Sequence, residues 1–237
     1  MITINGNNIY TSYGLIFQEL TGMLDMPKRK GLISRDWGTS IEPFLDAADI
    51  EFEGRNLELK CFGDIPAILT TGLLSLGTDW GTFAVYCQDE IKHDKKQLII
   101  PLFEPIWTLA TNEVSGTDTS GFRINGYNLS IHFGMTISEV SNLFDIPKRI
   151  DVGTTDYYKI TQYRESGIIN LTGLFEANQN GDLVTNIKKL YSVLISSGIK
   201  TFTFPDNSTY QVYAADGCQI KYIYPNMATF SLTLRKA

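Results

Sequence analysis

Few residues of this 237-residue chain are suited to acid–base or metal chemistry. Its two histidines, His93 and His132, are far apart in the sequence, and the lysine-rich run around His93 is typical of a charged hairpin loop. The chain contains no Gly-x-Ser-x-Gly, His-Glu-x-x-His, phosphate-loop or Gly-x-Gly-x-x-Gly motif. A nucleophile without a neighbouring base gives hydrolase chemistry little support. We therefore expect a protein that is not an enzyme.

Carboxylates are densest between Glu42 and Glu58. Paired carboxylates could serve glycosidase chemistry or a Ca²⁺ site. Their spacing fits no Ca²⁺ loop, however, and the alternation Glu51-Phe52-Glu53 is typical of the outer face of a strand. The 3 cysteines are odd in number, which disfavours a disulfide framework or a cysteine-based zinc site. We expect neither a metal nor a cofactor.

The most specific polar motif is Pro-Lys-Arg, which occurs at Lys28-Arg29 and again at Lys148-Arg149. One interpretation is a turn set by proline, in which the preceding aspartate bonds the local backbone. That interpretation explains the aspartate and the proline better than it explains two adjacent cations. The other is a basic corner that pairs with carboxylates of an adjoining domain or subunit. Lys28, Arg29, Lys148 and Arg149 are therefore candidate interface residues.

This motif belongs to a longer internal repeat with a constant spacing of 120 residues. Ile4-Asn5-Gly6 returns as Ile124-Asn125-Gly126, and 10 of the 26 positions from 4 to 29 are identical in the second copy. A register held that long indicates a duplicated domain. We predict two tandem domains, residues 1–118 and residues 122–237, joined by a polar linker within residues 112–121.

Each copy opens with Asn-Gly between β-formers, which predicts a tight hairpin. The predicted flanks are Met1–Ile4 and Asn8–Tyr13, and in the second copy Phe122–Ile124 and Asn128–Phe133. Leu15–Leu24 and Met135–Phe144 are compatible with either a short helix or a strand. Further strands are predicted at Glu51–Cys61, Thr82–Tyr86, Gln97–Phe103, Ile106–Ala110, Tyr157–Thr161, Ile168–Leu174, Lys200–Phe204, Tyr210–Ala214, Gln219–Tyr224 and Thr229–Arg235.

The clearest helix signal is Asp182–Ser197, which carries one apolar stripe and is followed by Gly198 at the usual C-terminal position. Its counterpart, Ile65–Leu76, contains Pro66 and Gly72 and should be shorter or irregular. The predicted fold class is mainly β (α+β). It comprises two tandem homologous β-sandwich or barrel domains, each with one packed helix.

The net charge of -6 is unevenly distributed: residues 1–120 carry 9 basic and 17 acidic residues, whereas residues 121–237 carry 11 and 9. The halves therefore differ in sign, -8 against +2. This difference is compatible with divergent solvated surfaces or with complementary faces of neighbouring domains. With no basic run and a pI near 5, we expect no direct nucleic-acid binding. No apolar run is long enough for a membrane span.

The second copy resembles the tail-tube-like domain of tailed phages. The resemblance rests on the opening hairpin, on the helix within Asp182–Ala214, and on the segments Ile199–Pro205 and Thr209–Ala214 that follow it. This order is similar to that of distal tail proteins and related tube and baseplate-hub proteins. In that family such domains form six-fold rings, and a chain with two copies can build the same ring from three chains.

The resemblance implies a structural component of a phage or prophage tail, a ring-forming distal tail or tube-like adaptor or hub. Expected partners are further copies of the chain, as a trimer with pseudo-six-fold symmetry or a hexamer, and neighbouring tail proteins. The implied location is the virion tail, after synthesis in the host cytoplasm. The long receptor-binding insertions of some distal tail proteins are absent. The alternative is a tandem β-sandwich binding module, for example for carbohydrate, without catalysis.

Overall fold

The computed structural model describes residues 1–30, 52–70, 72–94, 96–107, 113–144, 149–153, 160–164, 167–177, 180–196, 198–214, 216–224 and 226–237. These residues form two compact units. Unit 1 comprises Met1–Pro27 and Phe52–Thr108. Unit 2 comprises Lys28–Lys30 and the described residues from 113 onward. The domain limits 1–118 and 122–237 remain predictions.

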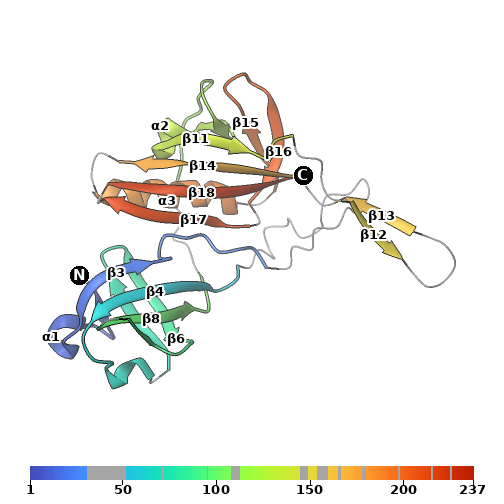
Figure 1. The fold of residues 1–237 in the computed structure, drawn as a ribbon. Coiled ribbons are helices and arrows are strands. Elements are labelled where there is room, and N and C mark those ends of the chain that lie inside the picture. Colours follow the sequence, from blue (N-terminus) through green and yellow to red (C-terminus); the bar gives the residue numbers. More distant parts are fainter. Residues whose placement is uncertain are drawn as a thin grey trace. The chain divides into compact units, whose positions relative to one another are not determined.

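Unit 1 is an antiparallel sheet with two short helical elements (Figure 1). Its helix α1 is Ile9–Tyr13 and its 3-10 helix η3 is Ala67–Thr70. The strands are β1 (Thr3–Ile4), β2 (Asn7–Asn8), β3 (Ile16–Thr21), β4 (Arg55–Phe62), β5 (Leu74–Thr78), β6 (Gly81–Cys87), β7 (Lys92–Asp94) and β8 (Gln97–Glu104). Inward side chains alternate along β4 and β8, as expected for strands with one face on the core.

Unit 2 repeats these elements and adds a long helix, α3 (Asn180–Ile195), to the short helix α2 (Leu129–Phe133). Its main sheet contains β9 (Arg123–Ile124), β10 (Tyr127–Asn128), β11 (Met135–Ser141), β14 (Ile168–Glu176), β15 (Lys200–Thr203), β16 (Thr209–Tyr213), β17 (Cys218–Tyr224) and β18 (Met227–Lys236). A separate hairpin pairs β12 (Arg149–Gly153) with β13 (Ile160–Arg164).

The two main sheets have the same strand order. In unit 1 the order is β2-β1-β5-β6-β8-β4-β3 with β7 on β8, and in unit 2 it is β10-β9-β15-β16-β18-β14-β11 with β17 on β18. A register shift occurs between Phe17 and Glu19 on β3, and again between Ile137 and Glu139 on β11. Two mainly β units of one topology confirm the predicted fold class.

The Asn-Gly hairpin is confirmed in both units, and the structure shows how it is fixed. Asn5 and Gly6 have φ angles of 50° and 79°, the left-handed region that Asn and Gly tolerate best. The Asn5 side-chain oxygen accepts a hydrogen bond from Ser75 N at 2.8 Å. Asn125 accepts the same bond from Thr201 N at 2.9 Å. Each asparagine therefore joins its turn to the next strand of the sheet.

The predicted strands Asn8–Tyr13 and Asn128–Phe133 are wrong beyond their first residue. Both segments form a helix of 5 residues instead, α1 and α2. The asparagine side chain caps the helix N-terminus, and Gly14 or Gly134, with φ of 68° or 64°, ends it. The segments that follow, where helix and strand were both open, are the strands β3 and β11.

The long helix and its shortened counterpart are both confirmed. In α3 the apolar stripe is buried, and Gly198 has φ of 79° just beyond the helix. The unit 1 counterpart is the single 3-10 turn η3. The predicted strand Ile106–Ala110 is wrong at Ile106 and Trp107, because β8 ends before Pro105, and its other residues lie outside the described chain.

Candidate functional site: the loops before and around the Pro-Lys-Arg motifs

The first Pro-Lys-Arg motif follows a tight turn at the end of β3. Gly22 has φ of 78°, and a Cβ there would lie 2.3 Å from the Asn56 carbonyl oxygen, so the turn requires glycine. Pro27 is buried, Lys28 is exposed and Arg29 is half-buried. Lys28 is therefore the motif's cation with the greater access to solvent or to a partner.

A buried arginine holds this turn in place. Arg55 donates from Nη1 to the carbonyl oxygen of Met23 and, at 3.2 Å, to that of Asp25. Its Nε donates to Glu104, its partner across β4 and β8. The guanidinium also lies 5.0 Å from the centre of the Phe83 ring. The cation thus connects the turn to the sheet and is balanced by a carboxylate.

The Arg55–Glu104 pair is built for structure rather than for proton transfer. Both side chains are buried. Burial raises the pKa of the Glu104 carboxyl, and the adjacent Arg55 guanidinium partly offsets that rise. A buried charge that is paired and hydrogen-bonded in this way fixes geometry, because leaving either partner alone would be costly.

Unit 2 anchors the corresponding turn with a different side chain. Lys236 Nζ donates to the carbonyl oxygen of Leu143, which stands 120 residues after Met23. The ammonium lies 5.4 Å from the centre of the Tyr210 ring. Strand pairing makes Tyr210 equivalent to Phe83. In unit 2, Tyr210 pairs with Phe202, which pairs with Ile124. In unit 1, Phe83 pairs with Leu76, which pairs with Ile4, the repeat equivalent of Ile124. Both turns thus contact one cation that also lies near an aromatic ring.

The second Pro-Lys-Arg motif is described only in part. Lys148 lies outside the described residues, whereas Arg149 begins β12 and pairs across the hairpin with Arg164 of β13. The first motif has no comparable described hairpin, because residues 31–51 lie outside the described chain. Nothing in the structure tests the predicted pairing of these four cations with carboxylates of an adjoining domain or subunit.

Arg29 has a cationic neighbour within unit 2. Lys200 is only 1% exposed, and its Nζ donates to the carbonyl oxygens of Ser196 and Gly198 at 2.5 and 2.8 Å. These carbonyls lie at and beyond the C-terminal end of α3, where an ammonium is favourable. Burial, with a further contribution from the Arg29 charge, lowers the pKa of Lys200 to about 8. Our sequence-based predictions did not include this buried cation.

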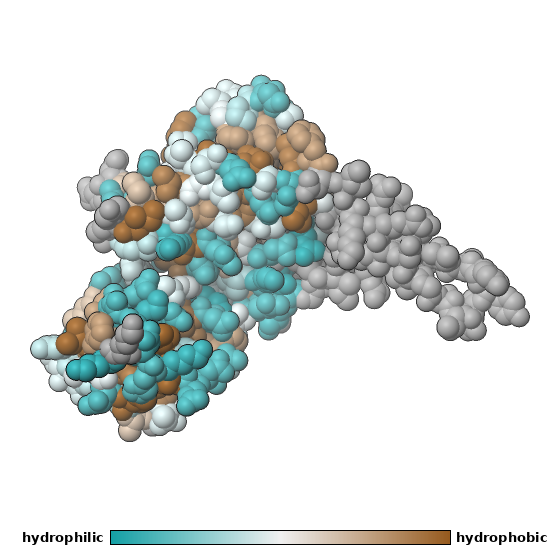
Figure 2. Space-filling model, viewed as in Figure 1, coloured by the Kyte–Doolittle hydropathy of each residue, from teal (hydrophilic) through white to brown (hydrophobic). Residues whose placement is uncertain are grey.

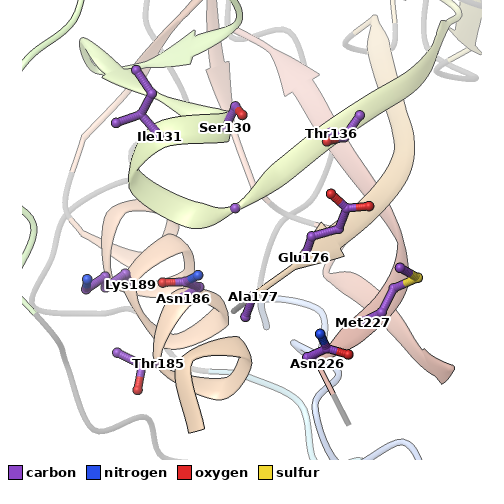
Figure 3. Close-up of a pocket in the computed structure, with 11 residues that line it drawn as sticks. Ser130, Ile131, Thr136, Glu176, Ala177, Thr185, Asn186, Lys189, Asn226 and Met227 are labelled. Carbon is purple, nitrogen blue, oxygen red and sulfur yellow. The ribbon is translucent and has the colours of Figure 1, made fainter. Parts of the chain in front are cut away.

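A shallow polar groove of about 650 Å³ lies in unit 2 between α2, β11, α3 and the β17–β18 turn (Figure 3). Asn186 and Lys189 of α3 form one wall, and Glu176 and Met227 lie on the opposite side. The remaining lining residues are Ser130, Ile131, Gly134, Thr136, Ala177, Thr185 and Asn226. These groups can bind polar ligands through hydrogen bonds, but the lining offers one carboxylate, not the pair that glycosidase chemistry uses.

The two histidines and Cys61 have no surroundings that indicate a catalytic role. His132 Nδ1 lies 3.2 Å from the Asn128 carbonyl oxygen, and its ring packs 5.5 Å from that of Tyr127. His93 is exposed on the strand β7 and pairs with Leu98 of β8, so it does not lie in the loop expected there. Burial raises the pKa of the Cys61 thiol to about 11, which disfavours the nucleophilic thiolate. No group of three or more potential metal ligands occurs among the described residues.

Only part of the dense acidic stretch can be placed. Glu53 and Glu58 are described, and the other carboxylates from Glu42 to Glu51 lie outside the described residues. Glu58 is half-buried and lies 3.3 Å from Lys60 Nζ, on the strand β4. Glu58 thus lies on the outer face of β4, whereas Glu53 is exposed ahead of the strand, which begins only at Arg55, so the predicted strand position of Glu53 is wrong.

Within the described chain, no helix is both long and apolar enough to cross a membrane.

Comparison with models of protein families, with curated proteins and with solved structures finds no match to this chain.

Proposed function

We propose that this chain is a non-enzymatic structural component of a phage or prophage tail, a ring-forming distal tail or tube-like adaptor or hub. The observation that supports this most strongly is the common strand order of the two units. Two units of one topology in one chain can occupy successive equivalent positions of a ring. Three chains then supply six positions, and closure needs only one repeated head-to-tail contact.

The surface of unit 1 offers a contact of this kind. Strand β3 is at one end of its sheet, and no strand of the described residues pairs with its outer edge. Ile16 is exposed on β3 and pairs with the exposed Phe62 of β4, and Phe17 is exposed beside them. On the visible face of the molecule, Figure 2 shows hydrophobic residues in brown among polar ones in teal. An edge strand with exposed apolar side chains is suited to burial against another subunit.

Charge supports the same arrangement. The sequence halves carry net charges of -8 and +2, so alternating contacts bring unlike charges together. Lys28 is exposed, and we assign Lys28, Arg29, Lys148 and Arg149 to ring or stacking contacts. Their partners are carboxylates of neighbouring chains or of adjoining tail proteins. The place of action is the virion tail, after synthesis in the host cytoplasm.

The alternative, a tandem β-sandwich module that binds carbohydrate without catalysis, is favoured by one observation, the polar groove of unit 2. Its hydroxyl and amide groups suit hydrogen bonds to a sugar. None of its lining residues is aromatic, so it offers no ring on which a sugar could stack. Saturable binding of an oligosaccharide that Asn186→Ala abolishes would favour this alternative over the ring.

Native mass spectrometry over a range of protein concentrations and salt tests the ring. We expect an assembly of three chains, each of 26.6 kDa, that dissociates at raised ionic strength because exposed ion pairs are screened. The double variants Lys28→Glu/Arg29→Glu and Lys148→Glu/Arg149→Glu should weaken the assembly. Lys92→Glu, at an exposed cation outside the motif, is the matched control. A monomer under every condition, or unchanged assembly of both double variants, would contradict the proposed contacts.

A further inference from the structure

Unit 1 contains a second groove, of about 660 Å³, between η3, β6 and β7. Its lining is largely apolar and includes Leu69 at the bottom, which is buried, and Ile65 and Leu73, which are exposed. Tyr86, Cys87, Ile91 and His93 form the β6 and β7 side, and Asp89 and Glu90 lie between these strands. We call this the η3 groove.

The positions of unit 2 equivalent to the β6–β7 side are buried. Strand pairing makes Tyr86 equivalent to Tyr213 and His93 equivalent to Ile220, because the paired partners on β8 and β18 correspond. By the same register Cys87 corresponds to Ala214 and Ile91 to Cys218. Tyr213, Ala214, Cys218 and Ile220 are all buried. Their unit 1 counterparts are half-buried or exposed.

The two units also differ in the length of one connection. Between β4 and β5 the chain has the single turn η3, whereas between β14 and β15 it has the 16-residue helix α3. Helix α3 packs against β14 and lies behind β14, β18 and β17 in the view of Figure 1. Its apolar stripe supplies the buried residues Leu183, Val184, Ile187, Leu190, Tyr191, Val193 and Leu194. Unit 1 has the same topology without this helical cover.

We propose that the η3 groove binds an amphipathic helix of a partner protein, in the position that α3 takes in unit 2. The apolar stripe of the partner helix contacts Ile65, Leu69 and Leu73. Asp89 and Glu90 are exposed at the rim, so the helix carries basic residues on the flank beside them. Helix α3 itself has this chemistry, with Lys188 and Lys189 beside its stripe. The proposal stands independently of the ring.

A peptide with the sequence of residues 180–196, labelled with a fluorophore, is the probe, and its anisotropy is measured as the full chain is added. We expect saturable binding. Leu73→Asp should weaken it at least about tenfold, because it places a charged side chain where the contact buries an apolar one. Asp89→Lys/Glu90→Lys should weaken binding as well, and should reduce its sensitivity to salt. Circular dichroism checks that each variant is folded.

The matched control is Ile131→Asp at the rim of the polar groove in unit 2. Ile131 is 66% exposed and Leu73 is 65% exposed, so the two substitutions perturb the fold similarly. Ile131→Asp should leave peptide binding unchanged. Absence of saturable binding would overturn the proposal. Binding that Leu73→Asp leaves intact would also overturn it, since the peptide would then be seated elsewhere, for example in place of α3.

Discussion

Arg55 and Lys236 hold equivalent turns from opposite strands of the same strand pair. Arg55 is on β4 and donates to the Met23 carbonyl, whereas Lys236 is on β18, the equivalent of β8, and donates to the Leu143 carbonyl. The two copies have therefore kept a cation at this carbonyl while moving it between neighbouring strands. The feature common to both units is a positive charge beside this carbonyl oxygen. In unit 1 the turn that this charge holds leads into the Pro-Lys-Arg motif.

The first prediction concerns the buried pair Arg55–Glu104. Arg55→Ala should lower the free energy of unfolding by about 3–5 kcal/mol, because it leaves Glu104 buried without its partner. The double variant Arg55→Met/Glu104→Leu should lose much less, since both charges are removed together. Urea unfolding measures both values. Hydrogen exchange should locate the loss of protection in unit 1.

Lys60 provides the comparison for that pair. It lies 2.8 Å from Glu19 and 3.3 Å from Glu58, and the side chains of these two glutamates are 47% and 45% exposed. Lys60→Ala should therefore change the free energy of unfolding by no more than about 1 kcal/mol. If Arg55→Ala were as mild as Lys60→Ala, the buried pair would not be what fixes the turn.

The second prediction is a pH dependence from Lys200. Its pKa in the folded protein is about 8, below the ordinary value of 10.5. Between these pH values the unfolded chain binds more protons than the folded one, so this lysine makes stability rise with pH. Relative to Lys200→Met, the wild-type protein should gain up to about 1.4 kcal/mol of unfolding free energy per pH unit in this window.

Urea unfolding of both proteins at several pH values from 7 to 10.5 measures this difference. All other titratable groups are common to both proteins and cancel in the comparison. Lys200→Met also removes the donor to the Ser196 and Gly198 carbonyls, which adds a constant cost. Parallel pH profiles for the two proteins would show that the Lys200 ammonium is not destabilised by burial.

Local chemistry allowed much of the fold to be predicted. Asn5-Gly6 specifies a hairpin turn through the φ angles of two residues, and the stripe of α3 needs only its own helical period. The short helix after the hairpin differs from the predicted strand because Asn8, which ends β2, is also the cap of α1. The Asn8 side chain accepts from Tyr10 N and Thr11 N, which is the geometry of a helix cap.

Features that depend on pairing across the chain were not predictable in this way. Arg55 stands at an inward position of β4, in step with the buried Leu57 and Leu59, and this parity was the one available signal of a buried charge. Its partner Glu104 is 49 residues away, and only the register of β4 with β8 brings the two together. Lys200 likewise reaches the Ser196 and Gly198 carbonyls, beyond the C-terminal end of α3, only because β15 begins directly after this helix.

The third prediction compares the two helix caps. Asn8→Ala should lower the free energy of unfolding by about 1 kcal/mol, the usual value of such a cap. Asn128→Ala should cost more, because Asn128 is buried and its Nδ2 also donates to the Ser120 carbonyl oxygen at 2.7 Å. Hydrogen exchange should show faster exchange in α1 for one variant and in α2 for the other. Equal costs would remove the role of the Ser120 contact.

The last prediction uses the two glycines that end the short helices. Gly14 and Gly134 have φ of 68° and 64°, so alanine at either position should cost about 1 kcal/mol from backbone strain. A Cβ at Gly14 would meet nothing within 4 Å, whereas a Cβ at Gly134 would lie 2.2 Å from the Glu176 carbonyl oxygen. Gly134→Ala should therefore cost a further 1–3 kcal/mol or so, because β14 or the end of α2 must shift. Urea unfolding gives both values, and equal losses for the two variants would mean that this contact can relax freely.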